Sequence, residues 1–245
     1  EKTKYVLILP GGGYAHCVTR EEGYPIAAKF NEMGYTAFVL EYRTGFHCTP
    51  YAPMEDVSRA IKHIEEHQVE YNIDPEGYAL CGFSAGDNLA GIYASHNHGY
   101  EEYGTRRPAT IMLGYPWTNM QHWLDHPYWN IWKGIMGVWL SERGFIYMFG
   151  RSCNHEKRES LCVQKQVRDD YPPTYIFSGG RDVLVPASHH AEVMVDALED
   201  HHIKYRYRRF FALPHGIGLG LGTSAEKWLK EAVDFWQENV AEKEN

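Results

Sequence analysis

A serine stands between two glycines in the segment 82–86, which reads Gly-Phe-Ser-Ala-Gly. An apolar run, Tyr78–Cys81, comes directly before it, and residues with helical spacing follow from Leu89. A tight turn between a strand and a helix holds such a serine in a strained conformation with its hydroxyl exposed, and the flanking glycines avoid backbone clashes. The pattern predicts that Ser84 is a nucleophile. The pentapeptide without this context is equally typical of an ordinary glycine-rich turn.

A serine hydroxyl is a weak nucleophile at neutral pH, so it needs an imidazole to take its proton and a carboxylate to orient that imidazole. Asp182 follows the β-rich segment Tyr175–Phe177, and His215 follows the segment Tyr205–Phe211. Both therefore come after Ser84, in the order serine, acid, histidine that this type of turn requires. We predict that Asp182 orients His215 and that His215 is the base. With 14 histidines in the chain, a chance placement is the alternative.

Attack on an ester carbonyl also needs hydrogen-bond donors for the negative oxygen that forms. Three glycines, Gly11–Gly13, stand directly after the first apolar run, and they let backbone N–H groups turn toward one point. We expect these donors to be Gly12, Gly13 and Ala85, the residue after the nucleophile. A phosphate-binding loop is the competing interpretation, but neither the GK[ST] nor the GxGxxG spacing follows.

The elements that must position these residues alternate between β-rich runs and helical stretches, as in a parallel sheet with helices on both faces. The predicted strands are Tyr5–Leu9, Thr36–Leu40, Tyr78–Cys81, Thr110–Leu113, Tyr175–Phe177 and Tyr205–Phe211. The predicted helices are Tyr24–Met33, Met54–Tyr71, Leu89–Ser95, Ala187–His201 and Ala225–Val240. The sequence thus predicts one three-layer α/β/α domain over residues 1–245, with a mainly parallel sheet of about six strands.

The alternation breaks between about residues 117 and 171, a segment that is rich in tryptophan. An unstructured loop of that length is uncommon, so we interpret the segment as an inserted helical lid. Its aromatic residues form either the core of the insert or part of the pocket lining, where flat rings suit sugars.

Composition excludes several classes of function. The 24 Lys+Arg and 32 Asp+Glu give a net charge of −8 without a basic stripe, so we expect no nucleic-acid partner. No apolar run approaches the roughly 18 to 20 residues of a bilayer span, so we expect no membrane partner. Five cysteines without CxxC spacing favour free thiols in a reducing compartment. We expect a cytoplasmic protein, with secretion after removal of a signal as the alternative.

Residues 63–67 read His-Ile-Glu-Glu-His, a spacing with which some zinc peptidases bind their metal. The apolar positions of this predicted helix lie on its other side, so His63 and His67 are expected on a solvated face. The pair His189–His190 is likewise expected at the surface. We therefore predict no metal site.

Together the motifs resemble those of an α/β-hydrolase of the hormone-sensitive-lipase-like esterase group. The closer resemblance is to small bacterial carbohydrate acetylesterases with a Pro-Gly-Gly-Gly-Tyr segment, here Pro10–Tyr14. The architecture covers nearly the whole chain, whereas the specific motifs are short. For such an enzyme we expect that no metal or organic cofactor is required. The resemblance also implies the roles assigned above: Ser84 as nucleophile, Asp182 as acid, His215 as base, and Gly12, Gly13 and Ala85 as oxyanion donors.

Three further residues, Tyr14, Asp87 and Trp117, are candidates for substrate contact. Asp87 departs from the family pattern, since many relatives have a second glycine at this position. A carboxylate in the first turn of a helix suits the helix dipole. If Asp87 points into the pocket instead, it accepts sugar hydroxyls and repels anions.

These observations predict a serine esterase that removes short acyl groups, acetyl above all, from carbohydrate. Its partner is a small-molecule or oligosaccharide ester. The preference for acetyl and for sugars rests on the resemblance and the aromatic segment, not on spacing. The alternatives are an amidase, peptidase or arylformamidase-like hydrolase on the same three residues, and a binding protein with an inactive site. The sequence leaves the oligomeric state open.

Overall fold

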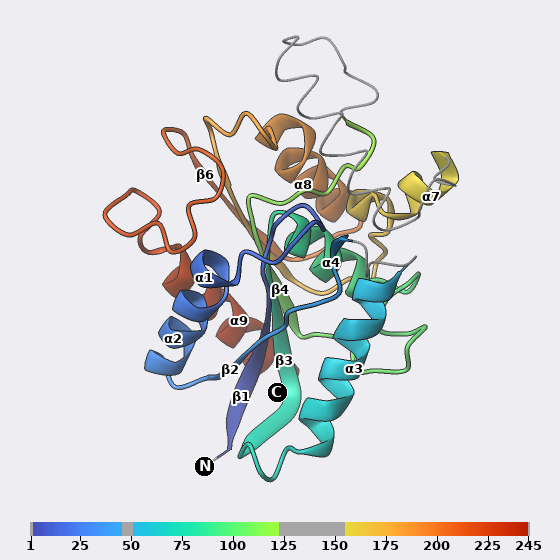
Figure 1. Ribbon diagram of the computed structural model, residues 1–245, viewed down its shortest axis with the longest axis vertical. Helices are drawn as coiled ribbons and strands as arrows, with labels where there is room; N and C mark the ends of the chain where they lie inside the picture. The colour runs from blue at the N-terminus through green and yellow to red at the C-terminus, as the bar shows by residue number, and fades with distance from the viewer. Residues whose placement is uncertain (1, 46–50, 123–154, 245) are drawn as a thin grey trace.

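The computed structural model describes residues 2–45, 51–122 and 155–244, which form a sheet of six parallel strands (Figure 1). The strand order is β2-β1-β3-β4-β5-β6, and each neighbouring pair is parallel. The strands are β1 (Thr3–Leu9), β2 (Thr36–Val39), β3 (Ile73–Phe83), β4 (Thr110–Gly114), β5 (Thr174–Gly179) and β6 (Tyr205–Phe210). The predicted parallel sheet is therefore confirmed.

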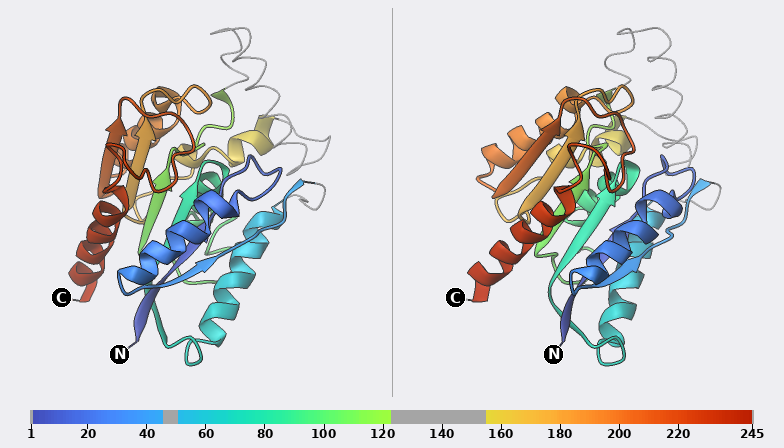
Figure 2. Two further views of the ribbon diagram at one scale, coloured as in Figure 1. Left: turned by 60° about the vertical axis from the view of Figure 1, so that its left-hand side comes forward. Right: turned by 90° about the vertical axis from the view of Figure 1, so that its left-hand side faces the viewer.

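Helices cover both faces of this sheet, with α2 and α9 on one face and α3, α4 and α8 on the other (Figure 2). The helices are α1 (Thr19–Glu22), α2 (Tyr24–Glu32), α3 (Ala52–Glu66), α4 (Ala85–Tyr93), α7 (His155–Ser160), α8 (Ala191–Asp200) and α9 (Trp228–Glu244). Within the described ranges, none is long and apolar enough to cross a membrane. The predicted three-layer fold is confirmed.

Alternating residues of β1 enter two separate hydrophobic cores. Leu7 belongs to the core that includes residues of α3, α4 and α8, whereas Val6 and Ile8 belong to the core that includes residues of α2 and α9. Successive side chains of a strand point to opposite faces, so a strand covered on both sides is apolar throughout. This burial explains why the continuous run Tyr5–Leu9 predicted a strand correctly.

The predicted helix Ala187–His201 is divided in the structure. A 3₁₀ turn over Ala187–His189 ends at His190, which has φ −132° and ψ −77°, and α8 begins directly after it. The carbonyl oxygen of His190 accepts a hydrogen bond from Thr118 Oγ1 at 2.9 Å, and its Nδ1 accepts one from Asn119 N at 3.2 Å. His190 is fully buried, so its predicted surface position is wrong. The segment that follows β4 covers it.

His63 lies as predicted on the outer face of α3, whereas His67, which directly follows the end of this helix, is half-buried. His63 and Glu66 are exposed, whereas Ile61 and Ile64 are buried. Among the residues that the structure describes, no group of three His, Cys, Asp or Glu side chains is arranged to bind a metal ion.

The predicted lid falls mainly on residues 123–154, which lie outside the described residues, so it stays a prediction. On either side of this stretch the chain packs into the domain, with Trp117 buried before it and Leu161 and Val163 buried after it. Asn88 Nδ2 on α4 donates a hydrogen bond to Leu161 O at 2.8 Å. Both flanks are therefore anchored to the core beside α4.

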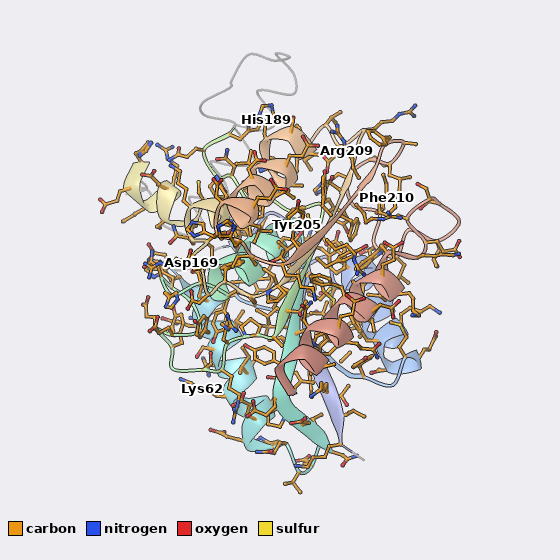
Figure 3. All side chains as sticks on the ribbon, turned by 180° about the vertical axis from the view of Figure 1, so that it is seen from behind. Lys62, Asp169, His189, Tyr205, Arg209 and Phe210 are labelled. Carbon is orange, nitrogen blue, oxygen red and sulfur yellow. The ribbon has the colours of Figure 1, made fainter. Side chains whose placement is uncertain are left out.

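Strand β6 forms one edge of the sheet and carries charged side chains. Figure 3 shows Tyr205, Arg209 and Phe210 along this strand. Arg206 pairs with Glu238 at 3.1 Å, and Arg208 pairs with Glu231 at 3.0 Å. Charges on an edge strand discourage pairing with another chain. Both partners lie on α9, so these ion pairs also fix the strand that leads to His215.

Gly86 lets α4 approach the end of β1 closely. A Cβ at this position would lie 1.9 Å from Leu9 O and 2.7 Å from Pro10 O. We predict that Gly86→Ala lowers the free energy of unfolding by at least about 3 kcal/mol, because two backbone segments must move apart. Urea unfolding followed by circular dichroism measures this change.

Gly104→Ala is the matched control for this substitution. Gly104 has φ +62°, but apart from its two chain neighbours no described residue has an atom that would lie within 4 Å of a Cβ there, so only the left-handed backbone is penalised, by about 1 to 2 kcal/mol. Equal stability of the two variants would show that the contact between α4 and β1 is not tight.

Candidate active site

Ser84 occupies a strained turn between β3 and α4. Its backbone has φ 52° and ψ −111°, a conformation that residues with a side chain rarely adopt. Ser84 N donates to Gly114 O at 3.1 Å, and Ser84 O accepts from Trp117 N at 3.3 Å. A Cβ at Gly82 would lie 2.5 Å from Gly86 O, so both glycines of the motif are required by close backbone approach. These contacts hold the strained turn that the motif predicted.

The structure brings Ser84, His215 and Asp182 into one hydrogen-bonded chain. His215 Nε2 lies 2.9 Å from Ser84 Oγ, and His215 Nδ1 lies 2.6 Å from Asp182 Oδ2. Asp182 is buried, and its other oxygen accepts from Leu184 N at 3.0 Å and Val185 N at 2.7 Å. Because the carboxylate accepts a hydrogen bond from the N–H group at Nδ1, Nε2 is the unprotonated nitrogen and can accept a proton from the serine hydroxyl. The arrangement can therefore activate this hydroxyl for attack.

The glycine loop after β1 lies beside Ser84, since a Cβ at Gly11 would be 3.0 Å from Ser84 Cβ. Gly12 and Gly13 have φ of +124° and +61°, which glycine adopts at little cost. Among the described residues, none accepts a hydrogen bond from the N–H groups of Gly12 or Gly13. Ala85 is the first residue of α4, so its N–H has no partner inside the helix. The N–H groups of the three predicted oxyanion donors are therefore without a hydrogen-bond partner among the described residues.

A comparison with models of protein families shows the family of this chain. A family model described as BD-FAE matches residues 1–198. The chain belongs to the BD-FAE family. This family is a group of bacterial α/β-hydrolase esterases, so the resemblance that the motifs indicated is confirmed.

The relatives of this BD-FAE chain include an acetylxylan esterase of Xylanibacter ruminicola. It is 26% identical over 236 residues, which are 96% of this chain and 45% of the relative. Endo-1,4-beta-xylanase B of Butyrivibrio fibrisolvens is 28% identical over 225 residues, which are 88% of this chain and 33% of the relative. The chain thus spans less than half the length of these curated relatives.

Among solved structures, an acetyl ester-xyloside bifunctional hydrolase from Caldicellulosiruptor lactoaceticus superposes on this BD-FAE chain with a TM-score of 0.80. The two sequences are 25% identical, and the match covers 97% of this chain and 84% of the other. The chain accordingly has the α/β-hydrolase fold.

Tyr14 and Trp117, two of the predicted substrate contacts, are buried in the domain. Tyr14 is fully buried, and its hydroxyl donates to Asn88 Oδ1 at 2.8 Å. Trp117 is 5% exposed, and it is the backbone N–H of this residue, not its ring, that donates a hydrogen bond to Ser84 O. Both side chains therefore pack inside the domain, and their predicted contact with substrate is wrong. The segments that follow β1 and β4 direct these side chains into the core.

Asp87, the third predicted substrate contact, is fully buried in the first turn of α4. Its Oδ1 accepts a hydrogen bond from Gly114 N at 3.1 Å. Burial raises the pKa of this carboxyl well above its usual value, and the charge of Glu22 adds to the rise. A carboxyl without solvent contact does not meet sugar hydroxyls, so the substrate interpretation is corrected. Asp87 does stand in the first turn of α4, but its raised pKa favours the neutral carboxyl, which gains little from the helix dipole.

Two residues that contact the site, Glu22 and Tyr115, were not predicted from the sequence. Glu22 Oε2 accepts from Gly11 N at 2.8 Å, and the Tyr115 ring centre lies 4.9 Å from that of His215. Tyr115 directly follows β4, so its place at the carboxyl edge of the sheet was a usable signal. Glu22 stands in the charged run Arg-Glu-Glu, which is typical of any solvated helical turn, so no pattern distinguished it.

The buried carboxyl of Asp87 makes stability depend on pH. Its pKa is raised in the folded state, so the folded protein binds this proton more tightly than the unfolded chain. The resulting stabilisation is complete below the unfolded pKa and is lost as the pH rises toward the folded pKa. We predict that Asp87→Asn loses less stability than the wild type as the pH rises above the unfolded pKa of about 3.9, by about 1.4 kcal/mol per pH unit in which only the folded state holds the proton.

Urea unfolding at several pH values measures this difference. Asp196→Asn, at an exposed position on α8, is the control and should follow the wild type. Parallel pH dependence of wild type and Asp87→Asn would contradict the assignment of a raised pKa to Asp87.

Proposed function

We propose that this BD-FAE chain is a serine esterase that removes short acyl groups, acetyl above all, from carbohydrate. The observation that carries the proposal is the hydrogen-bonded chain from Ser84 through His215 to Asp182, next to backbone donors that no described residue occupies. A binding module has no need for a strained serine within 2.9 Å of an oriented imidazole.

In the proposed first half-reaction, Ser84 Oγ attacks the ester carbonyl while His215 Nε2 takes its proton. The negative charge that develops on the carbonyl oxygen is met by the N–H groups of Gly12, Gly13 and Ala85. His215 then gives its proton to the departing sugar oxygen as the C–O bond breaks, so the sugar leaves as an alcohol. The acyl group stays on Ser84.

In the second half-reaction, a water molecule replaces the sugar. His215 Nε2 takes a proton from the water while the water oxygen attacks the acyl carbonyl. His215 then gives this proton to Ser84 Oγ as the bond between Oγ and the acyl carbon breaks, and the acyl group leaves as a carboxylic acid. Asp182 keeps Nδ1 protonated throughout, because Oδ2 accepts that proton's hydrogen bond and Oδ1 is held by two backbone N–H groups.

The acetyl and carbohydrate parts of the proposal are supported by the relatives rather than by the described side chains. An acetylxylan esterase and an acetyl ester-xyloside hydrolase are both similar to this chain over nearly its whole length. Acetylated xylo-oligosaccharides are therefore the first substrates to test.

We predict that Ser84→Ala lowers kcat by roughly 10,000-fold or more while the fold is retained, because the nucleophile is lost. Release of acetate from a chromogenic acetyl ester measures kcat, and circular dichroism checks folding. Ser188→Ala removes an exposed hydroxyl on the turn before α8 and should match the wild type. Turnover by purified Ser84→Ala at the wild-type rate would refute the assignment.

We also predict that acetylated xylo-oligosaccharides are hydrolysed with a kcat/KM at least roughly 100-fold above that of matched N-acetyl amides, because an amine is the poorer leaving group. Mass spectrometry of the products counts the lost acetyl groups. Faster cleavage of the amides would favour the amidase alternative and would overturn the esterase proposal.

A further inference from the structure

A buried chain of hydrogen bonds joins the glycine loop to the loop that carries His215. Gly11 N donates to Glu22 Oε2 at 2.8 Å, and Tyr115 OH donates to Glu22 Oε1 at 2.8 Å. The Tyr115 oxygen in turn accepts from Gly218 N at 3.2 Å. One carboxylate and one phenol therefore connect the two loops that flank Ser84.

Each member of this chain is held in place by its surroundings. Glu22 and Tyr115 are 5% and 1% exposed. Gly218 O accepts a hydrogen bond from Trp228 Nε1 at 3.0 Å. Both backbone polar groups of Gly218 are therefore hydrogen-bonded to buried side chains, which fixes this part of the loop. The Tyr115 ring meets the His215 ring edge-on, with an angle of 64° between the planes. A shift of the phenol would thus move the imidazole as well as the loop.

Glu22 also lies directly against the serine turn. A Cβ on Gly11 would be 2.7 Å from Glu22 Oε2 and 3.0 Å from Ser84 Cβ, so there is no space between them for a side chain. The pKa of Glu22 is raised, chiefly by burial, and the hydrogen bonds from Tyr115 and Gly11 and the nearby His215 offset only part of that rise.

We propose that Glu22 and Tyr115 are positioning residues for the hydrolysis, which set the distance between the oxyanion donors and His215. The inference rests on the proposed function. Neither residue touches substrate. They act through Gly11 and Gly218, so their loss misplaces donors and base relative to Ser84 while the binding surface is left in place.

Tyr115→Phe is the central variant, because it keeps the ring against His215 and removes only the hydroxyl. We expect kcat per folded molecule to fall about 10- to 100-fold, since small misplacements of catalytic groups are costly. KM should change less than about threefold, because the substrate surface is intact. Glu22→Gln should give the same pattern. The double variant should lose little more than the worse single variant, because both changes break one connection.

Tyr78→Phe is the matched control. Tyr78 is fully buried, and its hydroxyl donates to Arg106 O at 2.8 Å, roughly 20 Å along β3 from Ser84. This variant should lose comparable stability in urea and keep wild-type kcat. If Glu22→Gln does not fold, Tyr115→Phe against Tyr78→Phe still decides the question.

Two results separate the inference from the function on which it rests. If the wild type shows Ser84-dependent turnover but Tyr115→Phe keeps the wild-type kcat, the positioning role is overturned and the esterase proposal stands. If the wild type shows no Ser84-dependent turnover, both are overturned. A lowered kcat with an unchanged KM in Tyr115→Phe, absent from Tyr78→Phe, supports the positioning role.

Discussion

The parallel direction of the strands is the constraint on which the site depends. Because all six strands run the same way, the loops after β1, β3, β5 and β6 meet at one edge of the sheet. Each loop then supplies one kind of group: backbone donors, Ser84, Asp182 and His215. The separations of 2.9 Å and 2.6 Å along the serine–histidine–aspartate chain follow from this convergence, although the three residues are far apart in the sequence.

Two buried carboxyl groups, Glu22 and Asp87, flank the serine turn, and each is costly to keep out of water. Backbone N–H groups of Gly11 and Gly114 offset part of that cost. The strained φ of Ser84 adds a further penalty. Stability is thus lost at the same place where the chain assembles groups for chemistry, as is common for sites that require a fixed geometry.

The strands and the three polar residues of the hydrogen-bonded chain could be predicted because their signals are local. Tyr5–Leu9 is apolar without interruption, Ser84 stands in a five-residue motif, and chain order selects Asp182 and His215. The predictions for Tyr14 and Asp87 did not hold, because the direction in which these side chains are buried depends on distant partners such as Asn88 for Tyr14 and Gly114 for Asp87. For the same reason Glu22, whose partners lie on two other loops, carried no signal at all.

The central claim is that oriented neighbours make one serine hydroxyl reactive. The most direct measurement treats the purified protein with a fluorophosphonate, which reacts with activated serines, and locates the label by peptide mass spectrometry. The account predicts a single adduct on the peptide that contains Ser84. Protein that stays unlabelled, or a label on another serine, would contradict it.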